Sequence, residues 1–297
     1  MIIDTHIHLS HHLFRCEFPY LTRENGEFTV KSGVRAQVIA ESTAAGVEAC
    51  IEPAIDIDSN EKLLALAAQY PGFLYPAVGV HPTRTCRYHT VDEKGQKHER
   101  KLPLRRIADL AALAKRPGVV AVGETGLDYH HERRAQHRLR QKIWFIASLR
   151  IAHKNGLPVI LHIRSAADDA IRLLQAHKKY LHGGVCHCFN GTPAQAAQYV
   201  SLGLSLGIGA SLLQSGPGQQ PLEQAVKETP IEFLLLETDG PYVKPDCPEL
   251  PKKQRNKARN TSLILPAVAE RIAGLKGLTP EEVTRVTAEN AKRLFRL

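Results

Sequence analysis

The sequence of 297 residues has no run of about 18 or more apolar residues, the length that a membrane-spanning helix requires. Its amino terminus lacks the basic stretch followed by an apolar stretch that marks a secretory signal. Internal repeats, low-complexity tracts and interdomain linkers are also absent. The hydrophobic content of 43% is sufficient for a sizeable core. We therefore expect one domain over residues 1–297, without membrane association.

The six cysteines lack the paired spacing that is typical of a disulfide framework. Cys186 and Cys188 are separated by one residue, which is too close for an ordinary disulfide bridge. We interpret all six as free thiols in a reducing environment, which predicts a cytoplasmic protein.

Acidic residues are outnumbered, with 30 Asp and Glu against 39 Lys and Arg. The formal net charge is +9 and the isoelectric point is near 9.3. Such a balance favours acidic partners such as nucleic acid or phosphorylated substrates, and it carries no information about the fold.

Short apolar runs alternate with helix-length segments along the chain. The expected strands are residues 1–3, 47–55, 73–80, 119–122, 158–161, 184–186, 204–208 and 231–236. The expected helices are residues 34–45, 61–69, 104–114, 133–154, 166–177, 193–202, 222–229, 262–273 and 280–295, the last capped by Thr279. The polar segments 10–31 and 83–101 are expected to be long loops. Alternation with helices implies parallel pairing, so eight units predict an α/β fold, a (β/α)8 TIM barrel; an open doubly wound sheet is the alternative.

Residues of the kinds that bind metals follow five of the expected strands. They are His6 and His8 after the first strand, then Glu124, His162, His187 and Asp239 after later ones. Each alone has an ordinary interpretation, such as a loop histidine, a core histidine or a turn residue. In a barrel, however, all these strand ends meet on one rim. Four histidines and two carboxylates exceed the needs of one ion and suit two ions about 3.5–4 Å apart, which Glu124 can bridge.

Cys186 and Cys188 flank His187. If the strand alternation continues there, both thiols point away from the His187 side, toward the helices. We therefore expect packing thiols rather than metal ligands.

Six short motifs occur in order along almost the whole chain: Asp4-Thr5-His6-Ile7-His8, Gly79-Val80-His81-Pro82, Gly123-Glu124-Thr125-Gly126-Leu127-Asp128, Leu161-His162-Ile163-Arg164, His187-Cys188-Phe189-Asn190-Gly191 and Glu237-Thr238-Asp239-Gly240-Pro241-Tyr242. With these motifs the chain resembles the TatD family of metal-dependent hydrolases, within the amidohydrolase-like barrels. The resemblance implies a TIM-like barrel with a divalent metal site and a phosphodiesterase activity on DNA, typically exonucleolytic from the 3′ end. It places metal ligands at His6, His8, Glu124, His162, His187 and Asp239.

The chain departs from the family pattern in three places. The segment after His8 and the basic insertion 83–101 are longer than in the shorter family members. The family motif Arg-Asn-Glu-Pro is replaced here by Arg259-Asn260-Thr261-Ser262. These departures border the substrate side of a barrel and leave the metal-binding motifs intact.

Two basic segments follow expected strands and should therefore lie on the catalytic rim. Segment 83–101 has six basic and three acidic residues, and segment 240–260 has six basic and two acidic residues. Two such segments beside a metal centre indicate a polyanion site, although many basic loops are merely solvated. Tyr88 and Tyr242 are candidates for stacking on bases. The candidate substrate-binding residues are Arg164, His81, Arg259, Lys252, Lys253 and Arg255.

The functional hypothesis is a metal-dependent hydrolase of phosphodiester bonds in DNA, a 3′-5′ exodeoxyribonuclease that acts as a monomer. One or two divalent ions (Mg, Mn or Zn) would activate water, with Asp239 as ligand and general base and Glu124 as the bridge. An alternative is an amidohydrolase acting on a small ester, lactone, amide or aminoacyl ester. A catalytically dead nucleic-acid-binding barrel is a third possibility.

Overall fold

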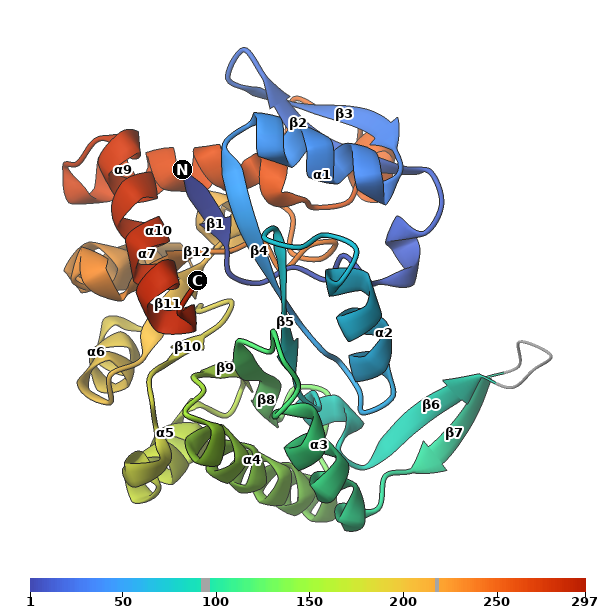
Figure 1. The fold of residues 1–297 in the computed structure, drawn as a ribbon. Coiled ribbons are helices and arrows are strands. Elements are labelled where there is room, and N and C mark those ends of the chain that lie inside the picture. Colours follow the sequence, from blue (N-terminus) through green and yellow to red (C-terminus); the bar gives the residue numbers. More distant parts are fainter. Residues whose placement is uncertain (92–96, 217–218) are drawn as a thin grey trace.

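A computed structural model describes residues 1–91, 97–216 and 219–297 (Figure 1). Eight parallel strands form one sheet in the order β1-β4-β5-β8-β9-β10-β11-β12. Their bounds are Ile2–Asp4 (β1), Val47–Pro53 (β4), Leu74–Val78 (β5), Ala121–Asp128 (β8), Val159–Arg164 (β9), Gly184–Cys186 (β10), Ser205–Ile208 (β11) and Leu234–Leu236 (β12). All eight lie within or beside the expected strand segments, so the predicted number of strands and their parallel pairing are confirmed.

The last strand returns to the first, so the sheet is nearly closed. The Thr5 amide donates to the Leu236 carbonyl at 2.9 Å, and the His8 amide donates to the Gly240 carbonyl at 2.8 Å. A parallel bridge joins Ile7 to Gly240 just beyond these strands. Backbone hydrogen bonds therefore join the first strand to the last as far as the rim of the barrel. The barrel prediction is confirmed, and the open-sheet alternative is wrong.

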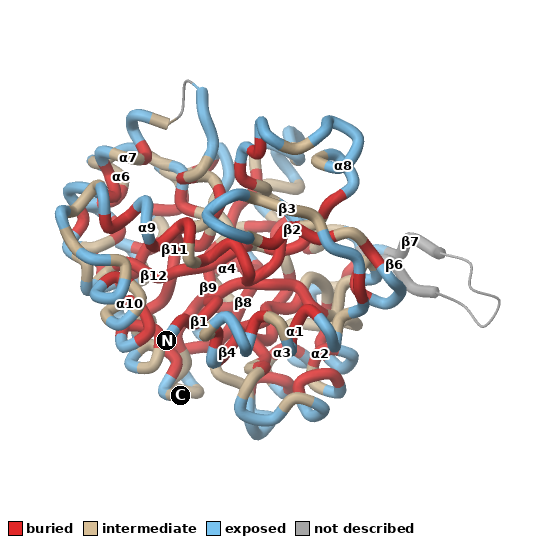
Figure 2. The backbone as a smooth tube through the Cα atoms, turned by 90° about the horizontal axis from the view of Figure 1, so that it is seen from above, coloured by how far each residue is buried: buried red, intermediate tan, exposed pale blue. Residues whose placement is uncertain are grey.

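Helices surround the barrel, and the strands are buried inside them (Figure 2). The helices are Arg35–Ala44 (α1), Ser59–Ala67 (α2), Ile107–Leu113 (α3), Ala135–Asn155 (α4), Ala167–Ala176 (α5), Pro193–Ser201 (α6), Gln219–Glu228 (α7), Lys252–Lys257 (α8), Leu265–Lys276 (α9) and Pro280–Phe295 (α10). Thr279 caps α10 as predicted, in a reciprocal capping box with Glu282. In the part of the chain that the structure describes, every helix is too short or too polar to cross a membrane.

The expected loop 10–31 is wrong in part, because it contains a hairpin of Phe18–Glu24 (β2) and Glu27–Gly33 (β3). Asn25 and Gly26 form its turn with φ angles of 51° and 88°, which is the geometry of a two-residue hairpin turn. Phe18, Tyr20 and Leu21 are buried. Burial of these side chains against the barrel therefore stabilises strands that the polar composition concealed.

The expected loop 83–101 is also partly wrong. A second hairpin, Arg87–Val91 (β6) and Lys97–Lys101 (β7), projects from the barrel in Figure 1. Asp92, Glu93 and Lys94, which belong to the basic segment 83–101, lie outside the described residues. The side chains of residues 88–100, including the candidate stacking residue Tyr88, also lie outside the described part of the chain.

Two strands extend further than expected, and this alters the setting of the site. The β8 strand runs on to Asp128 and the β9 strand to Arg164, paired from Thr125 with Leu161 to Asp128 with Arg164. Glu124 and His162 therefore lie within strands rather than after them. His162 pairs with Gly126 in this ladder, whereas Glu124 lies where the register shifts between Val122 and Thr125, and its backbone N–H donates to the Ala54 carbonyl at 3.2 Å.

Candidate metal centre

Four side chains from three strands of the barrel form a first cluster. His6 and His8 follow β1, Glu124 lies in β8, and Asp239 follows β12. The Nε2 atoms of His6 and His8 are 3.2 Å apart. His6 Nε2 lies 3.6 Å from Glu124 Oε2 and 3.7 Å from Asp239 Oδ1. His8 Nε2 lies 3.8 and 3.5 Å from the same two oxygens.

A second cluster forms around the other oxygen of Glu124. Glu124 Oε1 lies 2.8 Å from His162 Nδ1, 2.9 Å from His187 Nε2 and 3.4 Å from His81 Nε2. His162 Nδ1 is also 3.3 Å from His187 Nε2 and 3.2 Å from His81 Nε2. Glu124 thus directs one carboxylate oxygen into each cluster.

The clusters have the composition and spacing of a centre for divalent metal ions. Nitrogen and oxygen donors about 2.0–2.2 Å from one ion lie roughly 3–4 Å from one another. The donor separations in the first cluster, 3.2 to 3.8 Å, fall in this range. His6, His8 and Glu124 are buried, so bulk water does not solvate these close-packed donors. A cation between them would offset the cost of burying them.

The electrostatics differ between members of the clusters: although burial opposes it, neighbouring carboxylates raise the pKa of His8, His162 and His187, whereas burial lowers the pKa of His6. Burial opposes ionisation of Glu124, but the charge of His187 and the hydrogen bonds from His162 and His187 outweigh it and hold the pKa of Glu124 well below its ordinary value. Burial lowers the pKa of His81 to about 3, so its imidazole is neutral at physiological pH. A metal binds the neutral imidazole and the ionised carboxylate, so a cation would displace protons from His8, His162 and His187 on binding.

His81 is the donor whose placement the sequence did not predict. The sequence places it among the candidate substrate-binding residues. The structure places its Nε2 within the second cluster instead. The Thr83 hydroxyl lies 2.7 Å from His81 Nδ1 and holds the ring in that orientation.

A layer of buried acids supports the donors, and sequence reasoning missed most of it. The Asp4 carboxylate accepts hydrogen bonds from the Thr238 hydroxyl at 2.7 Å and the Ser262 hydroxyl at 2.7 Å. This network ties β1 to the segment that carries Asp239. Burial raises the pKa of Asp4 to about 7.

Glu237 supports the other side of the centre. Its Oε1 lies 3.6 Å from His187 Nδ1 and accepts the backbone N–H of Cys188. A Cβ at Gly207 would come within 1.9 Å of Glu237 Oε2, so only glycine at that position leaves room for the carboxylate. The motif Glu237-Thr238-Asp239 was the sequence signal for Glu237. Strand alternation does not predict where these side chains point, because the backbone leaves the extended conformation at Asp239, whose φ is 54°.

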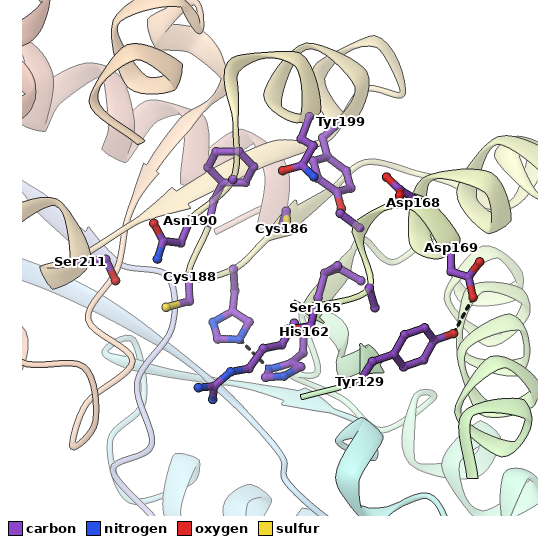
Figure 3. Close-up of a pocket in the computed structure, with 18 of the residues that line it drawn as sticks. Tyr129, His162, Ser165, Asp168, Asp169, Cys186, Cys188, Asn190, Tyr199 and Ser211 are labelled. Atoms are coloured by element: carbon purple, nitrogen blue, oxygen red, sulfur yellow. Dashed lines mark hydrogen bonds between the residues drawn. The ribbon is translucent and has the colours of Figure 1, made fainter. Parts of the chain in front are cut away.

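The predicted direction toward the helices is confirmed for Cys186 and wrong for Cys188, and neither thiol belongs to a group of potential metal donors among the described residues. Cys186 is buried beside Tyr199 of α6, in the helix layer. Cys188 has a φ of 46°, which breaks the strand alternation. Its thiol points toward Ser211 and lines the cleft shown in Figure 3. All six cysteines are free, as expected.

A cleft of about 880 Å³ opens beside the clusters, over the ends of β9, β10 and β11 (Figure 3). His162, His187 and Asp239 form its inner end. Arg164 is exposed on its wall, with Arg172 and Asn190 further along. Asp168 also lines the cleft, and no hydrogen bond joins it to Arg164 among the residues described.

The other candidate substrate residues lie on a different part of the rim. Arg259 lies beside His11 and Tyr242, which are joined by a 3.0 Å hydrogen bond. Lys252, Lys253 and Arg255 lie on α8, where both lysines are exposed. Within the described residues, no hydrogen bond or ion pair joins these three side chains to the clusters.

Comparison with known proteins relates the whole chain to one family. Residues 3–296 match the family model described as TatD related DNase. The chain is 36% identical over 274 residues to a 3′-5′ ssDNA/RNA exonuclease TatD from Edwardsiella piscicida, covering 92% of this chain and 96% of that protein. It is 32% identical over 297 residues to an uncharacterized metal-dependent hydrolase, YabD, of Bacillus subtilis, covering all of both chains.

Solved structures agree with this relationship. The crystal structure of YJJV, a TatD homolog from Escherichia coli, superposes with a TM-score of 0.78 at 26% identity, over 100% of this chain and 98% of that one. A TatD family hydrolase from Entamoeba histolytica has the same fold, with a TM-score of 0.76 at 23% identity over 99% and 97% of the two chains. The resemblance inferred from the motifs is therefore confirmed, and the chain belongs to the TatD family of metal-dependent hydrolases.

Proposed function

We propose that the chain is a metal-dependent phosphodiesterase that removes nucleotides from the 3′ end of single-stranded DNA and RNA. The observation that carries this proposal is Glu124, whose two oxygens are shared between two donor clusters at the mouth of the barrel. Relatives of this chain are named 3′-5′ ssDNA/RNA exonucleases. Their names support the DNA substrate expected from the sequence and add RNA to it.

The donor set assigns ligands for two divalent ions. His6, His8, Glu124 and Asp239 would hold one, and Glu124, His162, His187 and His81 would hold the other. When bound, such ions lower the pKa of water and polarise a phosphoryl oxygen. The nitrogen-rich set suits Zn²⁺ or Mn²⁺, whereas Mg²⁺ prefers oxygen donors and retains its water.

Asp239 is positioned to act as the general base. Its side chain is 15% exposed, more than that of Glu124, and it lies at the inner end of the cleft. Burial would raise its pKa, but the hydrogen bond with His8 and the charges of neighbouring histidines hold the pKa of Asp239 below its ordinary value. The carboxylate is therefore ionised at neutral pH and able to accept a proton.

The cleft suits a nucleotide held by its phosphate. A volume of about 880 Å³ lies in the usual range for small-molecule sites. Arg164 on its wall can donate two parallel hydrogen bonds to non-bridging phosphate oxygens. Ser165 and Asn190 add neutral hydrogen-bonding groups along the cleft, which serve a sugar or base better than an apolar amide.

The test is hydrolysis by metal-stripped enzyme to which one metal at a time is restored. Substrates are 5′-labelled single-stranded DNA and RNA, the same strands blocked at the 3′ end, and a panel of carboxylic esters and amides. We expect a ladder of products shortened from the 3′ end, and no cleavage of blocked strands. Turnover of esters or amides without cleavage of either strand would instead establish the amidohydrolase alternative.

A further inference from the structure

A second pocket, of about 450 Å³, opens on the same rim, between the end of β5 and the start of α4. It is formed by residues of the 3-10 turn Pro82–Arg84, by Cys86 and Arg87, and by the segment between β8 and α4. The residues that line it are Thr83, Arg84, Cys86, Arg87, His131, Glu132, Arg133, Arg134 and His137.

The charge in this pocket is strongly positive. Four arginines line it against one glutamate, and the glutamate is already engaged, because Glu132 accepts the Arg134 backbone N–H at 3.0 Å and contacts His137 Nδ1. Arg84 Nε is buried, and the described residues offer it no hydrogen-bond partner. Arg133 and Arg134 likewise have no side-chain ion pair within the described part of the chain.

The backbone adds to this field. Arg134 is the N-cap of α4, a helix of 21 residues, and it provides no side-chain hydrogen bond to the first turn. That turn contains no acidic residue. A helix N-terminus carries partial positive charge, so arginines there are unfavourable unless an anion is bound. Arginine side chains and free backbone N–H groups together are the usual elements of a phosphate site.

The pocket adjoins the second donor cluster. His131, on its wall, contacts Asp128 Oδ2 through Nδ1 at 2.8 Å, and Asp128 in turn contacts His162. Thr83 holds His81 on the other wall. Tyr129 lines the large cleft, whereas His131, two residues later, lines the pocket. The second cluster therefore lies between the two cavities.

An exonuclease must hold the substrate on both sides of the bond that it cleaves. We propose that the pocket binds a backbone phosphate of the retained strand, on the 5′ side of the scissile bond, while the large cleft takes the terminal nucleotide. This assignment rests on the proposed function. Its ligand is a phosphodiester of a single-stranded nucleic acid, recognised by Arg84, Arg133 and Arg134.

The variant that tests the proposal is Arg133→Gln with Arg134→Gln, because both side chains are exposed and outside the donor clusters. The matched control is Lys178→Gln with Lys179→Gln, which removes the same charge from exposed residues in the 3-10 turn after α5, at the opposite end of the barrel. Thermal unfolding of each variant verifies the fold. Metal-loaded protein is titrated with phosphorothioate-linked single strands of two and of ten nucleotides, which resist hydrolysis, over a range of KCl concentrations.

For the arginine variant, we expect affinity for the longer strand to fall by about tenfold or more, the factor expected when one charge-assisted hydrogen bond is removed. Affinity for the dinucleotide should fall much less. The slope of log K against log salt should become shallower by roughly 0.7, the value for one single-strand phosphate that the variant no longer binds. The lysine control should behave as wild type.

Equal decreases in affinity in the arginine and lysine variants, or equal decreases for both strand lengths, would overturn the phosphate assignment. Because binding is measured without turnover, this result is separate from failure of the proposed function. That failure would appear as no cleavage of any oligonucleotide by the wild-type enzyme with metal restored.

Discussion

Asp128 Oδ2 lies 3.0 Å from His162 Nε2, and this contact determines which nitrogen of His162 faces the centre. Burial opposes ionisation of Asp128, but the hydrogen bond from His162 outweighs it and lowers the pKa of Asp128. An ionised carboxylate only accepts hydrogen bonds, so Nε2 carries the proton. Nδ1 is then the nitrogen that faces Glu124, 2.8 Å away, and the one that a cation in the second cluster would contact. This is the carboxylate–histidine arrangement that orients metal-binding histidines.

We predict that Asp128→Asn weakens metal binding at the second cluster by about 10–100-fold, the usual effect of removing such a partner. Calorimetric titration of stripped protein with Zn²⁺ or Mn²⁺ measures the change. Asp169→Asn is the matched control, because Asp169 bonds Tyr129 and Lys142 rather than a cluster histidine. Unchanged affinity in the Asp128 variant would contradict the role assigned to this hydrogen bond.

Removing the carboxylate proposed as the bridge, Glu124, or the one proposed as the general base, Asp239, should abolish hydrolysis and leave the barrel folded. Asp239→Ala is expected to lower kcat by about 10²–10⁴-fold, the usual contribution of a general base, and Glu124→Ala at least as much because both clusters lose a donor. Circular dichroism verifies the fold, and Glu61→Ala, on the exposed face of α2, is the control. Near-wild-type turnover with metal present would show that the role given to that residue is wrong.

The basic helix α8 remains a candidate surface for the substrate strand. Neutralising Lys252, Lys253 and Arg255 together should raise KM on single-stranded DNA, because each phosphate contact releases counterions. The salt slope of binding should flatten by about two units if all three make contacts. Binding titrations over a range of KCl concentrations measure it. An unchanged slope would identify α8 as a solvated basic segment and leave the pocket beside α4 as the polyanion surface.

Asp169 should make part of the stability depend on pH. Its ion pair with Lys142 at 2.7 Å and the Tyr129 hydroxyl at 2.7 Å lower the pKa of Asp169. A carboxylate with a lowered folded-state pKa stabilises the protein above its unfolded pKa, near 3.9, and loses this contribution as pH falls further. Asp169→Asn should therefore lower the free energy of unfolding at about pH 7, and the difference from wild type should shrink at about pH 4 and below. Urea titrations at several pH values test this, and a difference that grows as pH falls would contradict it.

The sequence by itself determined the architecture and most members of the candidate metal centre. Eight apolar runs spaced by helices specify a parallel sheet, because each buried strand must pack on both faces. Because His6, Glu124, His162, His187 and Asp239 lie at the carboxyl ends of strands, a parallel barrel places them at one rim, independently of the conformation of the loops. The cap at Thr279 was also predictable, because a capping box depends on residues only three apart.

Other features depended on contacts between distant segments. Barrel closure rests on the backbone hydrogen bonds from Thr5 to Leu236 in β12 and from His8 to Gly240 just after β12. The hairpin of β2 and β3 exists because its apolar face is buried against the barrel, which a polar composition does not reveal.

The arrangement within the centre was likewise decided by tertiary structure. Periodicity gives the side to which a residue points, but not its distance from a residue on another strand. The position of His81 in the second cluster, the bond from Asp128 to His162 and the gathering of Arg84 with Arg133 and Arg134 all depend on how neighbouring strands and their following turns lie side by side. Only the folded chain sets those distances, because barrel closure and packing fix the separation of elements far apart in sequence.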